Sequence, residues 1–535
     1  MSLPSDHIDV AEAPAEPNQP KLGLIGWLRW VWRQLTSMRT ALFLLLLLAV
    51  AAVPGSLVPQ HLADPNGVVD YKLQHPTLYK ILDSLQVFDT YTSVWFSAIY
   101  LLLFVSLIGC VIPRIKHHLD ALRAAPPRTP ARLQRMAGFR ALIAPRGTDA
   151  ATAIELARSI LKSSGYRTVT LQSPHHSVSA ERGYLRETGN LVFHCALLGI
   201  LIAVGIGGGF GYSGQRLVVT GQTFVNSVGG YDAFNPGRFV DKNGLEPYSI
   251  TLDRLDVAYE TSNKNALGQP LDYTAHVTTK KPGEPAQKTT IKVNDPLSIG
   301  GTDVYLLANG YAPHITIRNT DGTVAFQDLV PFIPQDSNYT SQGVVKVPDG
   351  LAKQLGMIGF FYPTAAKLPT GALTSSYPGL KKPTLTFNVY QGDLGLDTGA
   401  PVNVYSLNVD NLTQIAGPGA KADTKGLQLV PGQTVALPGG LGSMTFDGVE
   451  RYATLDIHHD PTQNWVLLFA ICVLGGLLTS LFVPRRRVWV KAVPQADGML
   501  RLEYAGLARG EDPGLDAAIA AVVQKHSALV QGPKT

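Results

Sequence analysis

Four apolar runs of membrane-spanning length constrain the fold of this chain more than any other feature of its sequence. They cover residues 40–58, 93–112, 189–210 and 465–483. Each run has about the 20 residues that an α-helix needs to cross a bilayer core of roughly 30 Å. All six tryptophans lie at or near a predicted membrane edge, where indole rings anchor a span. The chain is therefore predicted to be a multi-pass membrane protein with four transmembrane α-helices.

The composition adds large aqueous parts to these spans. The 535 residues are 45% hydrophobic, which is high for a soluble protein and low for a transporter made only of helices. The three cysteines, Cys110, Cys195 and Cys472, all fall within predicted spans, so no disulfide is expected in the aqueous parts. The lack of a CxxC pair in the sequence argues against thiol–disulfide chemistry by this chain.

The distribution of Lys and Arg predicts the topology. Four of them lie before the first span, two in 59–92, thirteen in 113–188 and eight from residue 484 onward. By the positive-inside rule, both termini and residues 113–188 are expected in the cytoplasm, and residues 211–464 outside it. No cleavable signal peptide is expected, because the first 20 residues are acidic, rich in Pro and Ala, and typical of a disordered tail.

The two longest aqueous segments differ in periodicity. Within 113–188, helical spacing predicts a helix near 149–163, and two short strands are expected at 166–172 and 176–181, which makes a small cytoplasmic α+β element. Alternating runs separated by Gly- and Pro-containing turns predict a large all-β domain in 211–464, sandwich-like or an open barrel. Its strands are expected at 215–224, 248–259, 289–294, 303–311, 314–326, 384–390, 402–409, 426–430 and 442–459.

These patterns divide the chain into ten expected segments. The segment 23–39 alternates tryptophans with arginines, which suits a helix on a membrane surface, and a plain extension of the first span fits equally. The segments are a disordered tail (1–22), an interfacial amphipathic segment (23–39), the first span (40–58), an outer loop (59–92), the second span (93–112), the cytoplasmic α+β connection (113–188), the third span (189–210), the extracytoplasmic β domain (211–464), the fourth span (465–483) and a cytoplasmic tail (484–535).

His194 in the third span is the candidate functional residue. It is the only one of thirteen histidines inside an apolar run. An ionisable side chain within a bilayer is costly, which favours a functional role, and an imidazole nitrogen can bind a metal, including heme iron. A histidine that is merely hydrogen-bonded between packed helices is the alternative. Cys195 points about 100° around the helix from His194, so it need not share the ligand face.

Other histidines and glycines carry weaker signals. The pairs His117–His118 and His175–His176 lie in polar, solvated sequence and are not expected to bind metal. His458–His459, just outside the fourth span, either touches a ligand on the outer face or is simply exposed at a strand end. Glycines of the third and fourth spans allow close approach of another helix or a flat macrocycle, although each fits ordinary helix packing as well. These are Gly189, Gly199, Gly205, the 207–209 cluster and Gly475–Gly476. No phosphate loop, nucleophile elbow or HExxH is found, and no catalytic residue is assigned.

Several long motifs resemble one known family. They are WRQLTSMRTALFLLLLLAVAAVPGSLVPQ at 32–60, FDTYTSVWFSAIYLLLFVSLIGCVIPR at 88–114, GNLVFH at 189–194, TIKVNDPLSIGGTDVYL at 290–306 and PRRRVWV at 484–490. In this order they resemble the ResB/CcsB family of cytochrome c biogenesis proteins. The resemblance runs from about Trp27 to Val490 and leaves only the two tails outside it.

The resemblance implies a subunit of the System II apparatus in the cell membrane. Such a chain works with a ResC/CcsA-like membrane partner. Together they move heme b outward and attach it to the CxxCH motif of apocytochrome c. A thiol-reducing protein of the same pathway is implied as a further partner. By motif match, His194 is implied as one axial ligand of the heme iron, and the partner supplies the opposing histidine. The chain is implied to belong to a heme-lyase complex and not to act alone. Whether it takes part directly in thioether formation stays open.

Two other classes of function compete with this one. The chain could be a membrane-anchored scaffold whose β domain binds apocytochrome or a partner protein while the other subunit carries the heme. A membrane redox enzyme is disfavoured, because no CxxC, no second intramembrane histidine and no flavin or nicotinamide fingerprint is found in the sequence. No nucleic-acid partner is expected.

Overall fold

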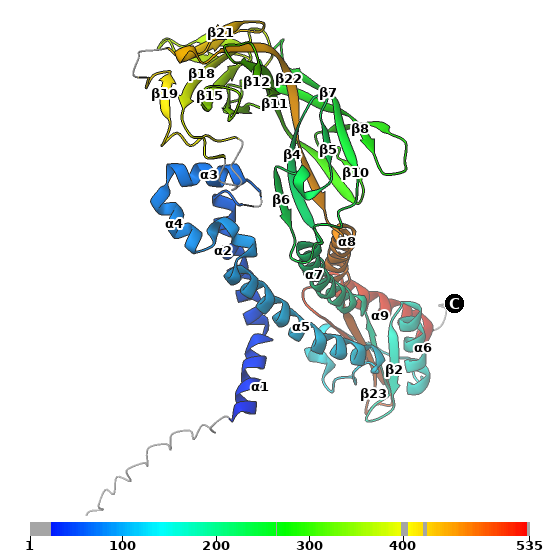
Figure 1. The fold of residues 1–535 in the computed structure, drawn as a ribbon. Coiled ribbons are helices and arrows are strands. Elements are labelled where there is room, and N and C mark those ends of the chain that lie inside the picture. The colour runs from blue at the N-terminus through cyan, green and yellow to red at the C-terminus, as the bar shows by residue number, and fades with distance from the viewer. Residues whose placement is uncertain (1–22, 62, 264, 397–404, 421–424, 532–535) are drawn as a thin grey trace, which may run out of the picture. The chain divides into compact units, whose positions relative to one another are not determined.

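The computed structural model describes residues 23–61, 63–263, 265–396, 405–420 and 425–531 (Figure 1). The chain divides into two compact units, one of Met1–Val204 with Thr462–Thr535 and the other of Gly205–Pro461. The first unit holds the long apolar helices and a mixed α/β domain, and the second is built from strands.

Four helices of the described chain are long and apolar enough to cross a membrane, which confirms the predicted number. They are α2 Met38–Leu57, α5 Val94–Arg123, α7 Leu185–Phe210 and α8 Gln463–Phe482. The Ser37 and Ser93 hydroxyls cap α2 and α5 by accepting backbone N–H bonds, which explains where these two helices begin. Only 6% of the most apolar window of α2, and the same share of α8, is buried within the chain. The apolar surface of both helices is therefore left for lipid or another protein.

The segments that flank α2 are also helical. Helix α1 covers Leu24–Leu35, and the stretch predicted as an outer loop folds into α3 Pro65–Gln74, α4 Pro76–Ser84 and the 3₁₀ helix η1 Val87–Thr92. Asp64 Oδ1 accepts the Gly67 N–H at 2.8 Å, and a proline opens each of the two α-helices. These are ordinary start signals for helices. Phe88 of η1 is fully buried against the rings of Tyr71 of α3 and Tyr79 of α4, and this contact holds the three short helices together.

The mixed α/β domain joins two segments that lie far apart in the sequence. Its five-stranded sheet has the order β1-β24-β23-β3-β2, and the predicted helix and strand pair are present as α6, β2 and β3. The tail predicted from 484 onward supplies β23 and β24 of the sheet and helix α9, so this part is a folded half of the domain. The bounds are β1 Ala137–Ile143, α6 Ala150–Ser163, β2 Arg167–Leu171, β3 Ser177–Arg182, β23 Arg486–Pro494, β24 Leu500–Ala508 and α9 Leu515–Gln531, with a short 3₁₀ turn η2 at Leu133–Arg135.

The burial of strand β23 explains why no strand was predicted from the sequence after residue 484. Val488 and Val490 face α6 and α9 in one buried cluster, and Trp489 on the other face is buried against Leu133 and Ala505. Alternate side chains of a strand point to opposite faces, and both faces of β23 are covered. Its sequence therefore lacks the apolar–polar alternation by which a half-buried strand is recognised.

The second unit is all β, as predicted. Strands β11 and β22, with 17 residues each, pair antiparallel from Asp303 opposite His458 to Arg318 opposite Ser443. Their sheet has the order β10-β11-β22-β4-β6, with β12 and β21 at its sides. One apolar core lies between this sheet and β13-β14-β15-β18-β19, and a second lies between it and β5-β7-β8-β9. The described strands form no closed barrel, so the sandwich-like form of the prediction holds.

Most of the expected strands are found, and three expectations change. The strand expected at 215–224 is divided into β4 Tyr212–Val219 and β5 Thr223–Val225, which belong to different sheets. The expected strands at 303–311 and 314–326 give the continuous β11 followed by β12, and of the strand expected at 402–409, residues 402–404 lie outside the described residues while 405–409 form no strand. The strands are β4 Tyr212–Val219, β5 Thr223–Val225, β6 Ala233–Pro236, β7 Ser249–Tyr259, β8 Pro270–Lys280, β9 Gln287–Lys292, β10 Leu297–Ile299, β11 Thr302–Arg318, β12 Val324–Leu329, β13 Ile333–Pro334, β14 Ser341–Val347, β15 Leu355–Tyr362, β16 Ala365–Lys367, β17 Leu373–Ser375, β18 Thr384–Gln391, β19 Thr413–Ala416, β20 Leu427–Leu429, β21 Thr434–Ala436 and β22 Ser443–His459.

A buried carboxylate fastens the end of α8 to the mixed domain. Glu181 in β3 has a side chain that is only 3% exposed, and it accepts bonds from Arg485 at 2.8 Å and from Arg487 at 3.0 Å. The Tyr184 hydroxyl donates to its second oxygen at 3.0 Å. Burial alone would raise the pKa of Glu181, but hydrogen bonds and charge from Arg485 and Arg487 outweigh burial and lower that pKa.

Replacement of Glu181 by alanine is expected to destabilise the mixed domain by about 3 kcal/mol, because it removes the buried carboxylate that Arg485 and Arg487 share and breaks both ion pairs at once. Pulse proteolysis of the detergent-solubilised full chain in urea measures this change. The control is Glu155→Ala, whose carboxylate is 56% exposed and pairs only with Arg158, so a loss under about 0.5 kcal/mol is expected there. Equal losses in the two variants would contradict the role of Glu181.

The lowered pKa of Glu181 predicts that the stability of the mixed domain depends on pH. The folded-state pKa of Glu181 lies below its ordinary value of 4.5, so its contribution is complete above about pH 4.5 and is lost as the pH falls through the folded-state pKa. Proteolysis midpoints of the wild type are therefore expected to fall below pH 4.5 more steeply than those of Glu181→Gln, which cannot titrate at this position. Parallel curves would show that other carboxylates control acid unfolding.

Candidate functional site

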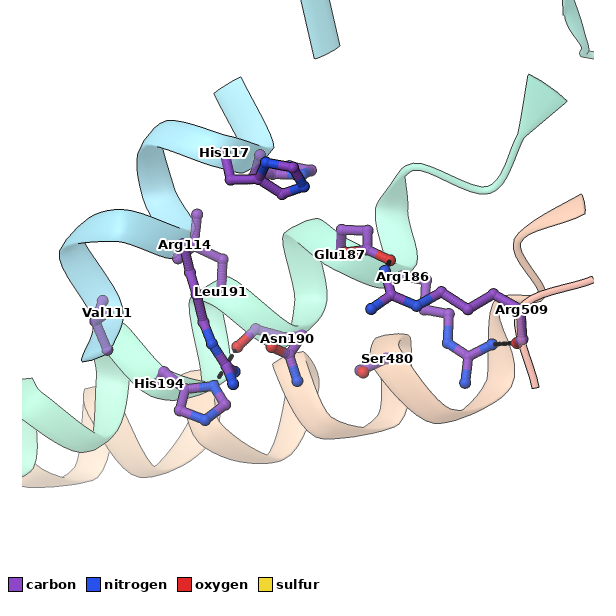
Figure 2. A pocket seen from close by; sticks show the side chains of 11 residues that line it. Val111, Arg114, His117, Arg186, Glu187, Asn190, Leu191, His194, Ser480 and Arg509 are labelled. Carbon is purple, nitrogen blue, oxygen red and sulfur yellow. Dashed lines mark hydrogen bonds and ion pairs between the residues drawn. The ribbon is translucent and has the colours of Figure 1, made fainter. Parts of the chain in front are cut away.

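A cavity of about 450 Å³ surrounds His194 within the first unit (Figure 2). Three apolar helices contribute to it, together with the residue that follows β24. Figure 2 shows polar side chains gathered around it from different helices. The lining residues are Val111, Arg114, His117 and His118 from α5, Arg186, Glu187, Asn190, Leu191 and His194 from α7, Ser480 from α8, and Arg509.

The hydrogen bond of His194 defines which of its ring nitrogens is free. Nδ1 lies 2.8 Å from the backbone oxygen of Asn190, one helical turn earlier. A carbonyl oxygen can only accept, so Nδ1 donates its hydrogen and Nε2 keeps its lone pair. An imidazole held in this way has the tautomer that ligates a metal through Nε2. The side chain is half-buried, and its ring meets Phe193 edge-on.

The cavity carries a surplus of positive charge. Among its lining residues are three arginines and one glutamate. The half-buried Arg114 donates to the sulfur of Met38, and Arg186 donates to the backbone oxygen of Arg509. Arg509 itself pairs with Glu187. A cavity of this kind suits a ligand that combines a metal with anionic groups.

The structure brings one histidine pair to the cavity that sequence reasoning had set aside. Helix α5 continues past the predicted span to Arg123, so His117 and His118 lie on its last turns and line the cavity. His118 is 7% exposed, and its Nε2 lies 3.0 Å from the Thr188 hydroxyl. The expectation that this pair lies in solvated sequence is therefore wrong for His118. The helical spacing of apolar residues beyond Pro113 was the signal that could have shown it.

The other candidate histidines lie outside this cavity. His175–His176 falls in the turn between β2 and β3. His459 ends β22, where its Nδ1 donates to the Gly301 oxygen at 2.7 Å and its ring stacks on Tyr212. Its neighbour His458 lies 2.8 Å from Asp456, and that hydrogen bond raises the pKa of His458. Among the described residues, no group of three His, Cys, Asp or Glu could hold a metal ion.

Helices α7 and α8 pack closely at Gly189 and Gly476, next to the turn that carries His194. A Cβ built on Gly476 would lie 2.7 Å from the Gly189 oxygen and 2.7 Å from the Phe193 nitrogen. A Cβ on Gly189 would lie 2.8 Å from the Gly476 oxygen. The two backbones therefore meet at this point, as small residues permit between membrane helices. Gly475, by contrast, faces open space.

Substitution Gly476→Ala is expected to destabilise the chain by about 1–3 kcal/mol, because backbone atoms of α7 cannot move away from the added methyl group independently. Gly475→Ala is the matched control and should be neutral or slightly stabilising, since alanine favours a helix. Thermal unfolding of the two variants in detergent, followed by circular dichroism, measures the difference. Equal unfolding temperatures would contradict the close contact.

Together, these features define a class of protein: a membrane protein with four spanning-length helices, a mixed α/β domain and a large sandwich-like β domain. The sequence model of the ResB-like family matches residues 38–520, and the chain belongs to that family. A cytochrome c biogenesis protein CcsB of Synechococcus sp. (strain CC9311) is 24% identical over 510 residues, covering 93% of this chain and 98% of the relative. The CcsB of Synechococcus sp. (strain CC9605) is 23% identical, covering 87% and 90% of the two chains. These similarities indicate a role in cytochrome c biogenesis.

Proposed function

We propose that this chain receives heme b at the cytoplasmic side of the membrane and helps deliver it for attachment to the CxxCH motif of apocytochrome c. It acts as one subunit of a System II complex with a ResC/CcsA-like partner. The observation that carries the proposal is the state of His194. Its Nδ1 is bonded to the Asn190 oxygen, and its Nε2 is free beside a basic cavity in a membrane helix. Heme is the substrate in this scheme.

In this proposal, His194 and a residue of the partner are the two axial ligands of the heme iron. His194 offers one axial nitrogen to the iron, and a second ligand is needed on the opposite face of the porphyrin. His118 is placed differently, because its Nε2 already contacts Thr188. We assign the opposing ligand to the partner. The exposed apolar surfaces of α2 and α8 are the faces on which such a membrane partner would pack.

The orientation of the chain follows from its charges in this proposal. The basic 113–188 connection and the 484–535 segment lie in the cytoplasm, and the β domain lies outside. His194 is five residues past Gly189, where the predicted span begins, or about 8 Å along the helix axis, so we expect it in the cytoplasmic leaflet. Heme is received there, and the outer β domain positions the apocytochrome. Thioether formation needs the partner, and a thiol-reducing protein keeps the substrate cysteines reduced.

Removal of the His194 imidazole is expected to abolish the six-coordinate heme spectrum of the complex. His194→Gly, purified with its partner from heme-replete membranes, leaves one axial position open, and added imidazole should refill it and restore the spectrum. Absorption spectroscopy of oxidised and reduced samples measures both effects. His175→Gly is the control, because it removes a histidine outside the cavity.

An unchanged spectrum in His194→Gly, with cytochrome c still matured, would overturn the assignment of the ligand. The chain would then act as a membrane-anchored scaffold whose β domain binds apocytochrome or a partner protein. In that case, substitutions on the surface of the β domain, and not at His194, would abolish maturation.

A further inference from the structure

We propose that Arg114 and Arg186 bind the two propionate groups of the heme and so fix its orientation at His194. This inference rests on the proposed function, because it assumes heme in the same cavity. It adds a requirement for free carboxylates on the ligand, which iron coordination alone does not impose.

The charges of the cavity point to a dianionic ligand. Its lining has three arginines against one glutamate, a formal surplus of two positive charges with the histidines neutral. The carboxylate of Glu187 is already engaged by Arg485 at 3.1 Å and by Arg509. Arg114 and Arg186 form no ion pair with a carboxylate of the described residues. Two heme propionates would match this surplus.

The known contacts of these two arginines leave most of their donors free. A guanidinium group has five N–H donors. Arg114 contacts the sulfur of Met38, a weak acceptor, and Arg186 contacts one backbone oxygen. A cation placed on an apolar helix is costly unless an acceptor of opposite charge satisfies it, and a planar guanidinium suits a carboxylate in particular.

The positions of these residues agree with one bound porphyrin. Arg186, Asn190 and His194 follow one another at intervals of four, so they share one face of α7. His194 and Arg186 are separated by about 12 Å of helix rise. A porphyrin ligated through Nε2 lies across this face, with one edge toward Arg186. Arg114 projects from α5 into the same cavity (Figure 2).

This orientation has a consequence for the chemistry of attachment. The propionates and the vinyl groups lie toward opposite edges of heme b. If Arg186 holds one propionate at the start of α7, the vinyl edge points along the helix toward its other end. The vinyl groups are the ones that form thioether bonds to the CxxCH cysteines. The reactive edge would therefore lead as heme moves outward.

The test compares heme with heme dimethyl ester, in which both carboxylates are blocked. Each ligand is titrated into the full chain co-purified with its partner, and affinity is read from the absorption change. For the wild type, the ester is expected to bind about a hundredfold more weakly, about tenfold for each of the two charge-assisted bonds that it loses. Arg114→Gln and Arg186→Gln should bind heme about tenfold more weakly and should bind the ester with wild-type affinity. Arg123→Gln is the control, because Arg123 is an exposed arginine of α5 that lies outside the cavity. Its affinities for heme and for the ester should equal those of the wild type.

The wild-type comparison needs no substitution, so it remains decisive even if a variant folds poorly. Equal affinity of the wild type for heme and its ester would overturn the inference, and so would a tenfold loss for Arg123→Gln. The His194→Gly spectrum with added imidazole is read separately. A six-coordinate spectrum that depends on His194 but not on the propionates would leave the proposed function standing and refute the role of the arginines alone.

Discussion

The backbone contact between α7 and α8 at Gly189 and Gly476 is the interaction on which the rest of the molecule depends. It brings Ser480 of α8 beside Gly189, and it brings Phe193, the neighbour of His194, beside Gly476. The strands that flank the two helices repeat this pairing, because β3 and β23 pair at one end and β4 and β22 pair at the other.

That arrangement explains why a polar cavity is tolerated within apolar helices. Glu181 and Glu187 hold the first residues after α8 through Arg485, which fastens the charged end of the helix pair. Polar groups near the end of a span are less costly than groups at its centre, since they can reach water or one another. The charges are therefore clustered at one end of α7, and His194 is the deepest ionisable group of the cluster on that helix.

The sequence predicts some of these features well and others poorly, for physical reasons. The spans and His194 are visible because hydropathy is a local property and an imidazole in an apolar run stands out. The bond from His194 to Asn190 also follows from helical spacing. The cavity does not, because Arg114, Arg186 and Arg509 come from three distant segments that only folding brings together. The two tail strands were missed because both faces of β23 are buried. No helix was predicted within the outer loop at 59–92, although Asp64 and the proline after it are start signals for one.

The surface of the helices argues that the described fold is one part of a larger assembly. In the proposed function, His194 occupies one face of the porphyrin, and six coordination of the iron needs a second axial ligand on the opposite face. Helices α2 and α8 leave nearly all of their apolar side chains outside the chain's own core. Lipid alone would satisfy that surface, but lipid supplies no second nitrogen ligand. In the proposed function, a partner helix that carries a histidine supplies both the apolar contact and the second ligand.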